Sequence, residues 1–231
     1  MIIAIDGPSG AGKSTLGRMI ARELGLLYID TGAMYRAAAL AVVRSGVSTQ
    51  DADAVAKIVS NVDIGLEGDP DSLRVSLDGQ DVSEDIRREE VSHSASMIST
   101  ISAVRRALVA RQRQLGERGR GAVLEGRDIG AVVFPNADVK FFLTATPEAR
   151  AQRRFEEDRL HERDASFETT LADISKRDQR DSTREDSPLG INDDAIVIDA
   201  SELSIDEVYE RMIGAIKLQE AKPQIAAEEH R

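Results

Sequence analysis

The sequence has no cysteine, and aromatic residues make up only 3% of its 231 residues. Without cysteine, the chain has no disulfide bond, no cysteine metal ligand and no thiol nucleophile. With so few aromatic side chains, Leu, Ile, Val and Ala must fill the hydrophobic core. The length allows one or two domains, and a single α/β domain with insertions fits it.

Long apolar runs and an excess of positive charge are also missing. No run reaches the length that spans a membrane, and the first residues lack the pattern of a secretory signal peptide. The formal net charge of −11 repels a nucleic-acid backbone, although a local cluster of Arg and Lys can still bind a small anion. We therefore expect a cytoplasmic protein that acts on small molecules, with no membrane and no nucleic-acid polymer as a partner.

The hydrophobic pattern predicts buried strands that alternate with helices. Short apolar runs end at turn residues at 2–5, 26–29, 122–124, 139–143 and 196–198. Helical spacing of apolar residues is found at about 16–24, 34–44, 51–60, 90–117, 148–160 and 167–181, and a capping box at 204–207 opens a last helix. This alternation predicts an α/β fold with a parallel sheet and helices on both faces.

Residues 62–82 have a different pattern, in which apolar and polar residues alternate on both sides of a turn at Asp78 and Gly79. A period of two predicts a small antiparallel β insert. The predicted plan is a core at residues 1–33 and 86–219, with an insert region at residues 34–85 that contains this β insert. We expect the polar tail at residues 220–231 to be frayed.

Residues 7–14 match the phosphate-loop motif G-x-x-x-x-G-K-[ST] between a predicted strand and a predicted helix. The glycines let backbone N–H groups point at phosphates, and the helix N-terminus adds to the positive field. The motif places Lys13 on the β- and γ-phosphates and the Ser14 hydroxyl on Mg²⁺. We predict that ATP binds with Mg²⁺ at nine residues: Gly7, Pro8, Ser9, Gly10, Ala11, Gly12, Lys13, Ser14 and Thr15.

Triphosphate binding alone does not separate a switch, a motor and a kinase. A GTPase switch would carry an Asn-Lys-x-Asp guanine motif, which the sequence lacks, and a motor usually needs a longer chain. A small-molecule kinase must gather cations around its acceptor phosphate, because two phosphate groups repel each other. The planar fork of Arg suits this role. The candidates are Arg36, Arg105, Arg127, Arg153, Arg154, Arg177, Arg180 and Arg184, whereas Arg106, Arg111, Arg113 and Arg118 are expected on solvated helix faces.

Several segments resemble the bacterial cytidylate kinase family over about residues 2–217. They are the phosphate loop, residues 30–36, residues 126–130 with residues 133–135 and Ala137, the Arg-Asp pairs at 177–178 and 180–181, Arg184, and Pro188-Leu189. The resemblance implies a P-loop NTPase-type parallel sheet, a β-containing insert that binds the nucleoside monophosphate, and a short helical lid at about residues 150–166. It also implies a monomer that moves the γ-phosphate of ATP to CMP or dCMP.

The resemblance further implies roles for single residues. The acceptor site would consist of Thr31, Tyr35, Arg36, Ser96, Arg105, Arg127, Asp128, Arg177, Asp181 and Arg184. Within it, Arg36, Arg127 and Arg184 would bind phosphate. Arg177 and Asp181 would contact the ribose side. The residues that neutralise charge during transfer would be Lys13, Arg127, Arg153, Arg177 and Arg184, with Arg153 on the lid over ATP.

Base choice has a physical reason beside the resemblance. Cytosine presents an N4 amino donor, for which a carboxylate such as Asp128 is the natural acceptor, whereas uracil presents a carbonyl there. The resemblance implies that Ser96 and Arg105 read the rest of the ring. The simpler hypothesis is that Asp128 only orients Arg127. Glu125 stands where the family pattern suggests Asp, and a role near Mg²⁺ is left open. The alternatives are a UMP or shikimate kinase and a nucleotide-sensing module without catalysis.

Overall fold

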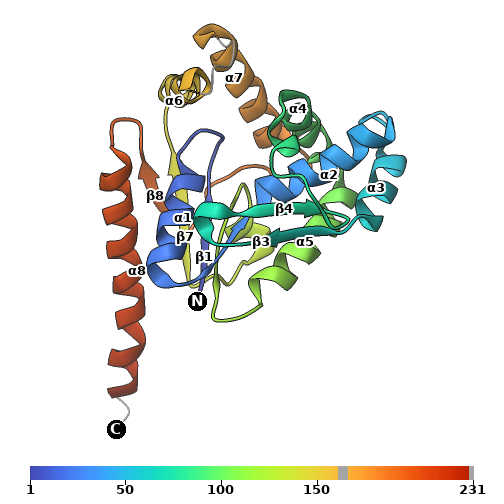
Figure 1. Cartoon of the computed structure of the whole chain (residues 1–231). Coiled ribbons are helices and arrows are strands. Elements are labelled where there is room, and N and C mark those ends of the chain that lie inside the picture. The colour runs from blue at the N-terminus through green and yellow to red at the C-terminus, as the bar shows by residue number, and fades with distance from the viewer. Residues whose placement is uncertain (161–165, 229–231) are drawn as a thin grey trace.

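A five-stranded parallel sheet forms the centre of the molecule (Figure 1). The computed structural model describes residues 1–160 and 166–228, with side chains as far as residue 221. The strand order is β2 (Leu27–Asp30), β6 (Ala122–Gly126), β1 (Ile2–Asp6), β7 (Val139–Thr144) and β8 (Ile196–Asp199). All four pairings are parallel, so the carboxyl ends meet at one edge. The five predicted strands are confirmed.

Helices cover both faces of the sheet because successive residues of each strand point to opposite sides. Ile3 and Ile5 of β1 pack in a cluster with α1 (Lys13–Leu24) and α8 (Ile205–Glu228). Ala4, between them, packs in the opposite cluster with α2 (Thr31–Ser45) and α5 (Ser102–Gly116). The predicted layer arrangement is therefore confirmed.

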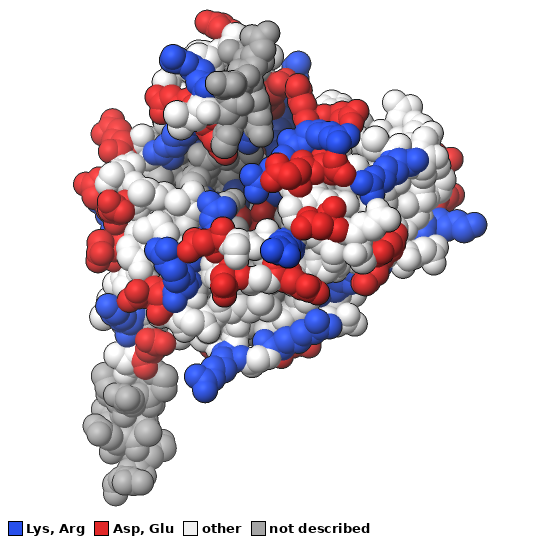
Figure 2. Space-filling model, viewed as in Figure 1, with Lys and Arg blue, Asp and Glu red and all other residues white. Residues whose placement is uncertain are grey.

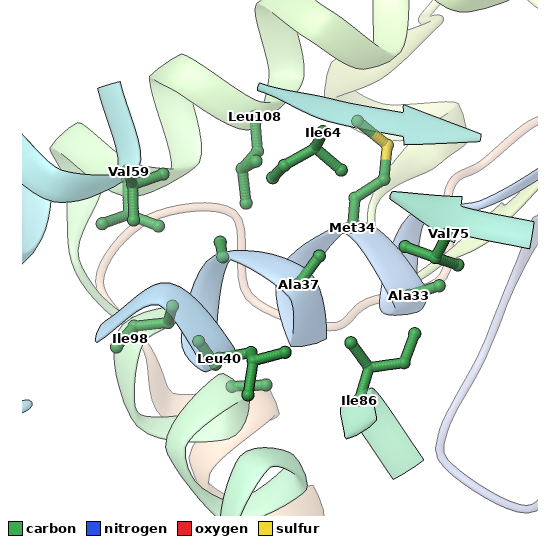
Figure 3. Close-up of a cluster of buried hydrophobic side chains, with 14 of the residues drawn as sticks. Ala33, Met34, Ala37, Leu40, Val59, Ile64, Val75, Ile86, Ile98 and Leu108 are labelled. Carbon is green, nitrogen blue, oxygen red and sulfur yellow. The ribbon is translucent and has the colours of Figure 1, made fainter. Parts of the chain in front are cut away.

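The predicted β insert is an antiparallel sheet in the order β3 (Ile64–Glu67), β4 (Arg74–Leu77) and β5 (Gln80–Asp81). It joins the same hydrophobic cluster as α2, α3 (Ala52–Asn61), α4 (Glu89–Ile98) and α5. Figure 3 shows side chains of the insert, such as Ile64 and Val75, beside Met34 of α2. Since the insert shares its core with later helices, the domain boundary at residue 86 stays a prediction.

The single long helix expected at residues 90–117 is wrong, because the structure divides it into α4 and α5. The break lies at Ser99 and Thr100. Their hydroxyl groups donate to the carbonyl oxygens of Ser96 and Met97, three residues back, at 2.9 Å and 2.8 Å. Such side-chain bonds compete with the backbone bonds that would continue a helix.

Two charged helices, α6 (Pro147–Leu160) and α7 (Phe167–Thr183), lie together beyond the carboxyl edge of the sheet (Figure 1). Part of the expected lid, residues 161–165, lies outside the described residues. The frayed tail expected from residue 220 is wrong as far as residue 228, because α8 continues to that point, and residues 229–231 lie outside the described part. Among the described helices, none is long and apolar enough to cross a membrane.

Candidate active site

The phosphate loop connects β1 to α1 and depends on glycine. Gly7, Gly10 and Gly12 have φ angles of 145°, 79° and 95°, which only glycine adopts readily. A Cβ on Gly7 would lie 2.0 Å from the carbonyl oxygen of Leu143, so the loop runs directly against β7. The resulting curve ends at the N-terminus of α1, where free backbone N–H groups and the helix dipole favour an anion.

Lys13 is the buried cation of this loop, with 6% of its surface exposed. Its Nζ atom donates a hydrogen bond to the carbonyl oxygen of Pro8 at 2.7 Å. Burial lowers the pKa of Lys13, the positive charge of Arg127 lowers it further, and the carboxylate of Glu125 acts against both. A bound polyphosphate would supply the negative charge that favours the protonated ammonium group. Ser14, the next residue, is exposed, so a ligand can reach its side chain.

Glu125 lies at the end of β6, buried beside the phosphate loop. Its carboxylate accepts a hydrogen bond from the hydroxyl of Tyr28 and has the Ser14 hydroxyl as a second hydrogen-bonding neighbour. Burial raises the pKa of Glu125, and the charge of Asp30 raises it further. A hydroxyl and a carboxylate side by side are oxygen donors of the kind that Mg²⁺ prefers, so these residues fit that ion.

Three charged side chains form a cluster next to Lys13. The Nε atom of Arg127 donates to Oδ2 of Asp181 at 2.8 Å, and Nε of Arg177 lies 4.0 Å from the same oxygen. Burial alone would raise the pKa of Asp181, but the two guanidinium groups lower it. Nε of Arg177 is buried and has no hydrogen-bond partner among the described residues. With Lys13, this phosphate-side cluster has three positive charges and one negative charge.

A second cluster, the base-side cluster, surrounds Asp128. Arg105 forms an ion pair with Oδ2 of Asp128, and Nη2 of Arg184 lies 3.6 Å from Oδ1. All three side chains are buried, and Arg105 also donates to the hydroxyl of Tyr35 at 3.4 Å. The Nη2 atom of Arg184 has no hydrogen-bond partner in the described part of the chain. This nitrogen can donate a hydrogen bond to a ligand.

The contacts of Asp128 and Arg184 bear on two sequence expectations. Asp128 pairs with Arg105 and Arg184, while the carboxylate bound to Arg127 is that of Asp181, so the hypothesis that Asp128 merely orients Arg127 is wrong. Arg184 lies in the same cluster as Asp128, and its expected role on phosphate stays a prediction. Its Nε atom donates to the carbonyl oxygen of Ser187 at 2.7 Å, which holds the guanidinium there. The order of residues along the chain gives no indication of this placement.

The other residues expected at the acceptor site lie on α2 and α4. Thr31 donates from its hydroxyl to the carbonyl oxygen of Glu125 at 2.6 Å, which ties the start of α2 to the end of β6. Arg36 forms an ion pair with Asp30 at 3.1 Å. Ser96 of α4 accepts a hydrogen bond from Arg180 of α7. This hydrogen bond connects α4 to α7.

The arginines expected on the lid, Arg153 and Arg154, have contacts within the protein. Arg153 donates to the carbonyl oxygen of Ala200, after β8, so its expected place over ATP stays a prediction. Arg154 pairs with Asp158 at 3.2 Å. Burial lowers the pKa of Arg177, and the positive charges of Arg127 and, more weakly, Arg154 lower it further. Figure 2 shows Lys and Arg side chains reaching into the hollow below α6 and α7, although the chain carries 41 acidic and 30 basic residues.

Two arginines expected on solvated faces have structural contacts. Arg111 donates to the carbonyl oxygen of Val62 at 2.6 Å, and Arg113 donates to that of Val133 at 2.9 Å. They join α5 to the insert and to the segment after Asp128. Arg106 and Arg118 are exposed, as expected.

Asp6 is a site residue that the sequence reasoning missed. It ends β1, is 3% exposed, and accepts hydrogen bonds from the backbone N–H groups of Ile129 and Gly130, both at 2.8 Å. Burial raises its pKa to about 6, against the lowering effect of those two bonds. Asp6 therefore holds the turn that follows Asp128. The sequence feature that could have pointed to Asp6 is its position directly before the phosphate loop.

Comparison with known proteins gives one consistent result. The family model described as Cytidylate kinase matches residues 3–218. A protein named cytidylate kinase from Rhodococcus opacus (strain B4) is 49% identical over 213 residues, which are 92% of this chain and 93% of that protein. Another cytidylate kinase, from Caldanaerobacter subterraneus subsp. tengcongensis, is 48% identical over 215 residues, which are 93% and 94% of the two chains.

Solved structures add a likeness of fold. An uncharacterized protein from Eubacterium ventriosum ATCC 27560 superposes with a TM-score of 0.51, over 94% of this chain and 98% of that chain. The two are 14% identical, so the likeness concerns the fold alone.

Proposed function

The chain belongs to the cytidylate kinase family, and we propose that it transfers the γ-phosphate of ATP to CMP or dCMP, giving ADP and CDP or dCDP. The observation that carries this proposal is the buried Asp128 carboxylate with Arg105 on one oxygen and Arg184 near the other. This arrangement offers both an acceptor and a donor for a nucleobase edge. No observation favours a UMP kinase, a shikimate kinase or a sensing module.

ATP is assigned to the phosphate loop, residues 7–15, with Lys13 on its terminal phosphates. Mg²⁺ is assigned to the Ser14 hydroxyl, with Glu125 as the neighbouring carboxylate. When bound, Mg²⁺ neutralises charge on the β- and γ-phosphates. The buried contact between Tyr28 and Glu125 orients the carboxylate, as outer-shell hydrogen bonds do at metal sites.

The acceptor is proposed to lie between the two charged clusters. Its phosphate faces the phosphate-side cluster, where Arg127 is positive and Nε of Arg177 has no hydrogen-bond partner among the residues that the structure describes. Arg36 of α2 is proposed to bind the same phosphate. Its base faces Asp128. Asp181 contacts both Arg127 and Arg177, so the ribose is assigned to its neighbourhood between the two ends.

Cytosine is favoured over uracil by the acceptor-only character of an ionised carboxylate. Asp128 accepts from the N4 amino group of cytosine, while Arg184 and Arg105 donate to ring acceptors. Ser96 supplies a hydroxyl that now binds Arg180 and can bind a base instead. Uracil would place a carbonyl against the carboxylate and leave a buried charge without its partner, which is strongly unfavourable.

Transfer needs no covalent intermediate and no strong general base, because the attacking phosphate oxygen is ionised at neutral pH. The chain's own contribution is to bring the two phosphates together and to neutralise the charge of the transition state with Lys13, Arg127 and Arg177. Closure of the lid at about residues 150–166 would exclude water and so prevent wasteful hydrolysis of ATP. We also propose that the enzyme is cytoplasmic and works as a monomer, with residues 34–85 as its acceptor-binding region.

A coupled assay of ADP release tests the function. The wild-type protein is supplied with ATP, Mg²⁺ and one of six acceptors: CMP, dCMP, UMP, AMP, GMP or shikimate. The proposal expects the highest kcat/KM with CMP or dCMP. Highest activity with another acceptor would contradict the proposed substrate. Binding of ATP without release of ADP in any mixture would indicate a sensing module.

A further inference from the structure

Arg150 lies in the first turn of α6 and is 3% exposed. Its guanidinium donates two hydrogen bonds to Asp178 of α7, at 3.1 Å and 2.6 Å. It also donates to the carbonyl oxygens of Ser9 at 3.2 Å and Ala145 at 2.9 Å. A Cβ on Gly10 would lie 3.1 Å from Cβ of Arg150, so the phosphate loop rests directly on this side chain. One buried residue joins the phosphate loop to α7.

The residues next to Asp178 on α7 belong to the acceptor side. Arg177 precedes it, and Asp181, one turn later, binds Arg127 at 2.8 Å. Arg180 donates to Ser96 of α4. A single turn of α7 is therefore joined to the phosphate loop through Asp178 and Arg150, to the phosphate-side cluster through Asp181, and to α4 through Arg180.

We propose that Arg150 is a positioning residue that couples the two substrate sites, because it fixes α7 relative to the phosphate loop through Asp178. The inference rests on the proposed function and names a residue that touches neither substrate. When triphosphate binds the backbone of the loop, Ser9 is held, Arg150 is held with it, and the turn of α7 that carries Arg177 and Asp181 becomes fixed. ATP thereby tightens CMP binding, and CMP tightens ATP binding by the same factor.

The contact has the properties that coupling requires. A bidentate Arg–carboxylate pair fixes orientation as well as distance, which the point charge of Lys cannot do. The pair is largely buried, so its geometry is not lost to solvent exchange as at exposed pairs. The third and fourth hydrogen bonds hold the guanidinium plane, so a displacement of Ser9 is transmitted to Asp178.

Isothermal titration of CMP into the full-length protein, with and without saturating ADP and Mg²⁺, measures the coupling factor. We expect wild type to show a factor of at least about 5, the lower range of typical allosteric couplings. Arg150→Lys and Asp178→Asn should reduce the factor toward 1, while the affinity for CMP alone changes less than about twofold. The double variant should be no worse than the more affected single variant, because both substitutions break one pair.

Asp194→Asn is the matched control, since Asp194 forms a 2.6 Å pair with Lys140 of β7, outside the phosphate loop and the acceptor-binding region. It should leave the coupling factor unchanged. A wild-type factor of 1, or folded variants with the wild-type factor, would overturn the inference. If Arg150→Lys does not fold, Asp178→Asn decides alone, because its side chain is a quarter exposed and the substitution keeps its shape. Failure of the proposed function is separate, since it would appear as wild-type protein that releases no ADP with CMP.

Discussion

Arg184 and Asp128 lie side by side in the buried base-side cluster, with 3.6 Å between Nη2 and Oδ1. Arg105 takes the other carboxylate oxygen, so Asp128 is held from two directions. Burial of three charges is unfavourable unless they are paired, and here the pairing leaves one Arg184 nitrogen without a hydrogen bond among the described residues. From this relationship we expect Arg184 to be among the groups that meet the base.

Arg184→Ala should therefore weaken recognition of the base. Removal of one charge-assisted donor is worth roughly 1.5–3 kcal/mol, or about 10- to 100-fold in kcat/KM for CMP. Ribose 5-phosphate, which has the phosphate and no base, should inhibit wild type and variant equally. If the binding of CMP and of ribose 5-phosphate weakens by the same factor, Arg184 binds the phosphate and not the base. Arg106→Ala, on an exposed face of α5, is the control.

Lys13→Ala should abolish transfer without unfolding the protein. The ammonium group neutralises charge that develops on the transferred phosphoryl group, so kcat should fall at least about 100-fold. Circular dichroism and the melting temperature check the fold, and Lys57→Ala on the exposed face of α3 is the matched substitution. Turnover at the wild-type rate by folded Lys13→Ala protein would contradict the assignment of the loop.

The sequence was sufficient for features that depend on local pattern. Apolar runs such as residues 2–5 and 139–143 predicted strands of the sheet, because a strand buried on both faces is apolar throughout. The phosphate loop could be predicted because its glycines and Lys13 occur at the fixed spacing of the motif. The break at Ser99 was missed, because serine and threonine hydroxyls bend a helix only when they bond to the backbone.

Features that depend on contacts between distant residues were out of reach. Asp6 binds backbone groups 123 and 124 residues away, and nothing in its own neighbourhood predicts that bond. Arg150 meets Ser9 across 141 residues. Arg184 was predicted as a site residue from the resemblance, but its place beside Asp128 depends on the turn that binds its Nε atom to Ser187.

Asp6 should make stability depend on pH. Its pKa in the folded protein, about 6, is above its ordinary value of 3.8, so the folded state binds the proton more tightly. The stability present below about pH 4 is lost as the pH rises through 6. The loss is at most about 3 kcal/mol, since one pKa unit corresponds to about 1.4 kcal/mol.

Asp6→Asn removes this titration and places an amide N–H near a backbone N–H, which lowers stability by about 1–3 kcal/mol. Urea unfolding of both proteins between pH 4 and pH 7 gives the comparison. The advantage of wild type over Asp6→Asn should shrink as the pH rises. Parallel pH profiles for the two proteins would show that Asp6 does not titrate in this range.

Glu125→Gln should raise the Mg²⁺ concentration needed for activity. The substitution keeps the size of the side chain and its contact with Tyr28, but removes the negative charge beside Ser14. Outer-shell changes at metal sites lower metal affinity by about 10- to 100-fold, and half-maximal activity should shift accordingly. A Mg²⁺ titration at fixed ATP measures the shift. Glu117→Gln is the control at an exposed position. If Glu125→Gln leaves the Mg²⁺ titration unchanged, Glu125 is not part of the metal site.

The choice of cytosine by Asp128 is the centre of the account, and one ratio tests it most directly. Asp128→Asn keeps the shape of the side chain but introduces an amide N–H that can meet O4 of uracil. The measurement is kcat/KM for CMP and UMP on wild type and variant, with Asp173→Asn on the exposed face of α7 as control. We expect the UMP-to-CMP ratio to rise by about 10- to 100-fold, the effect of one charge-assisted hydrogen bond. If CMP and UMP fall by the same factor, Asp128 does not read the base.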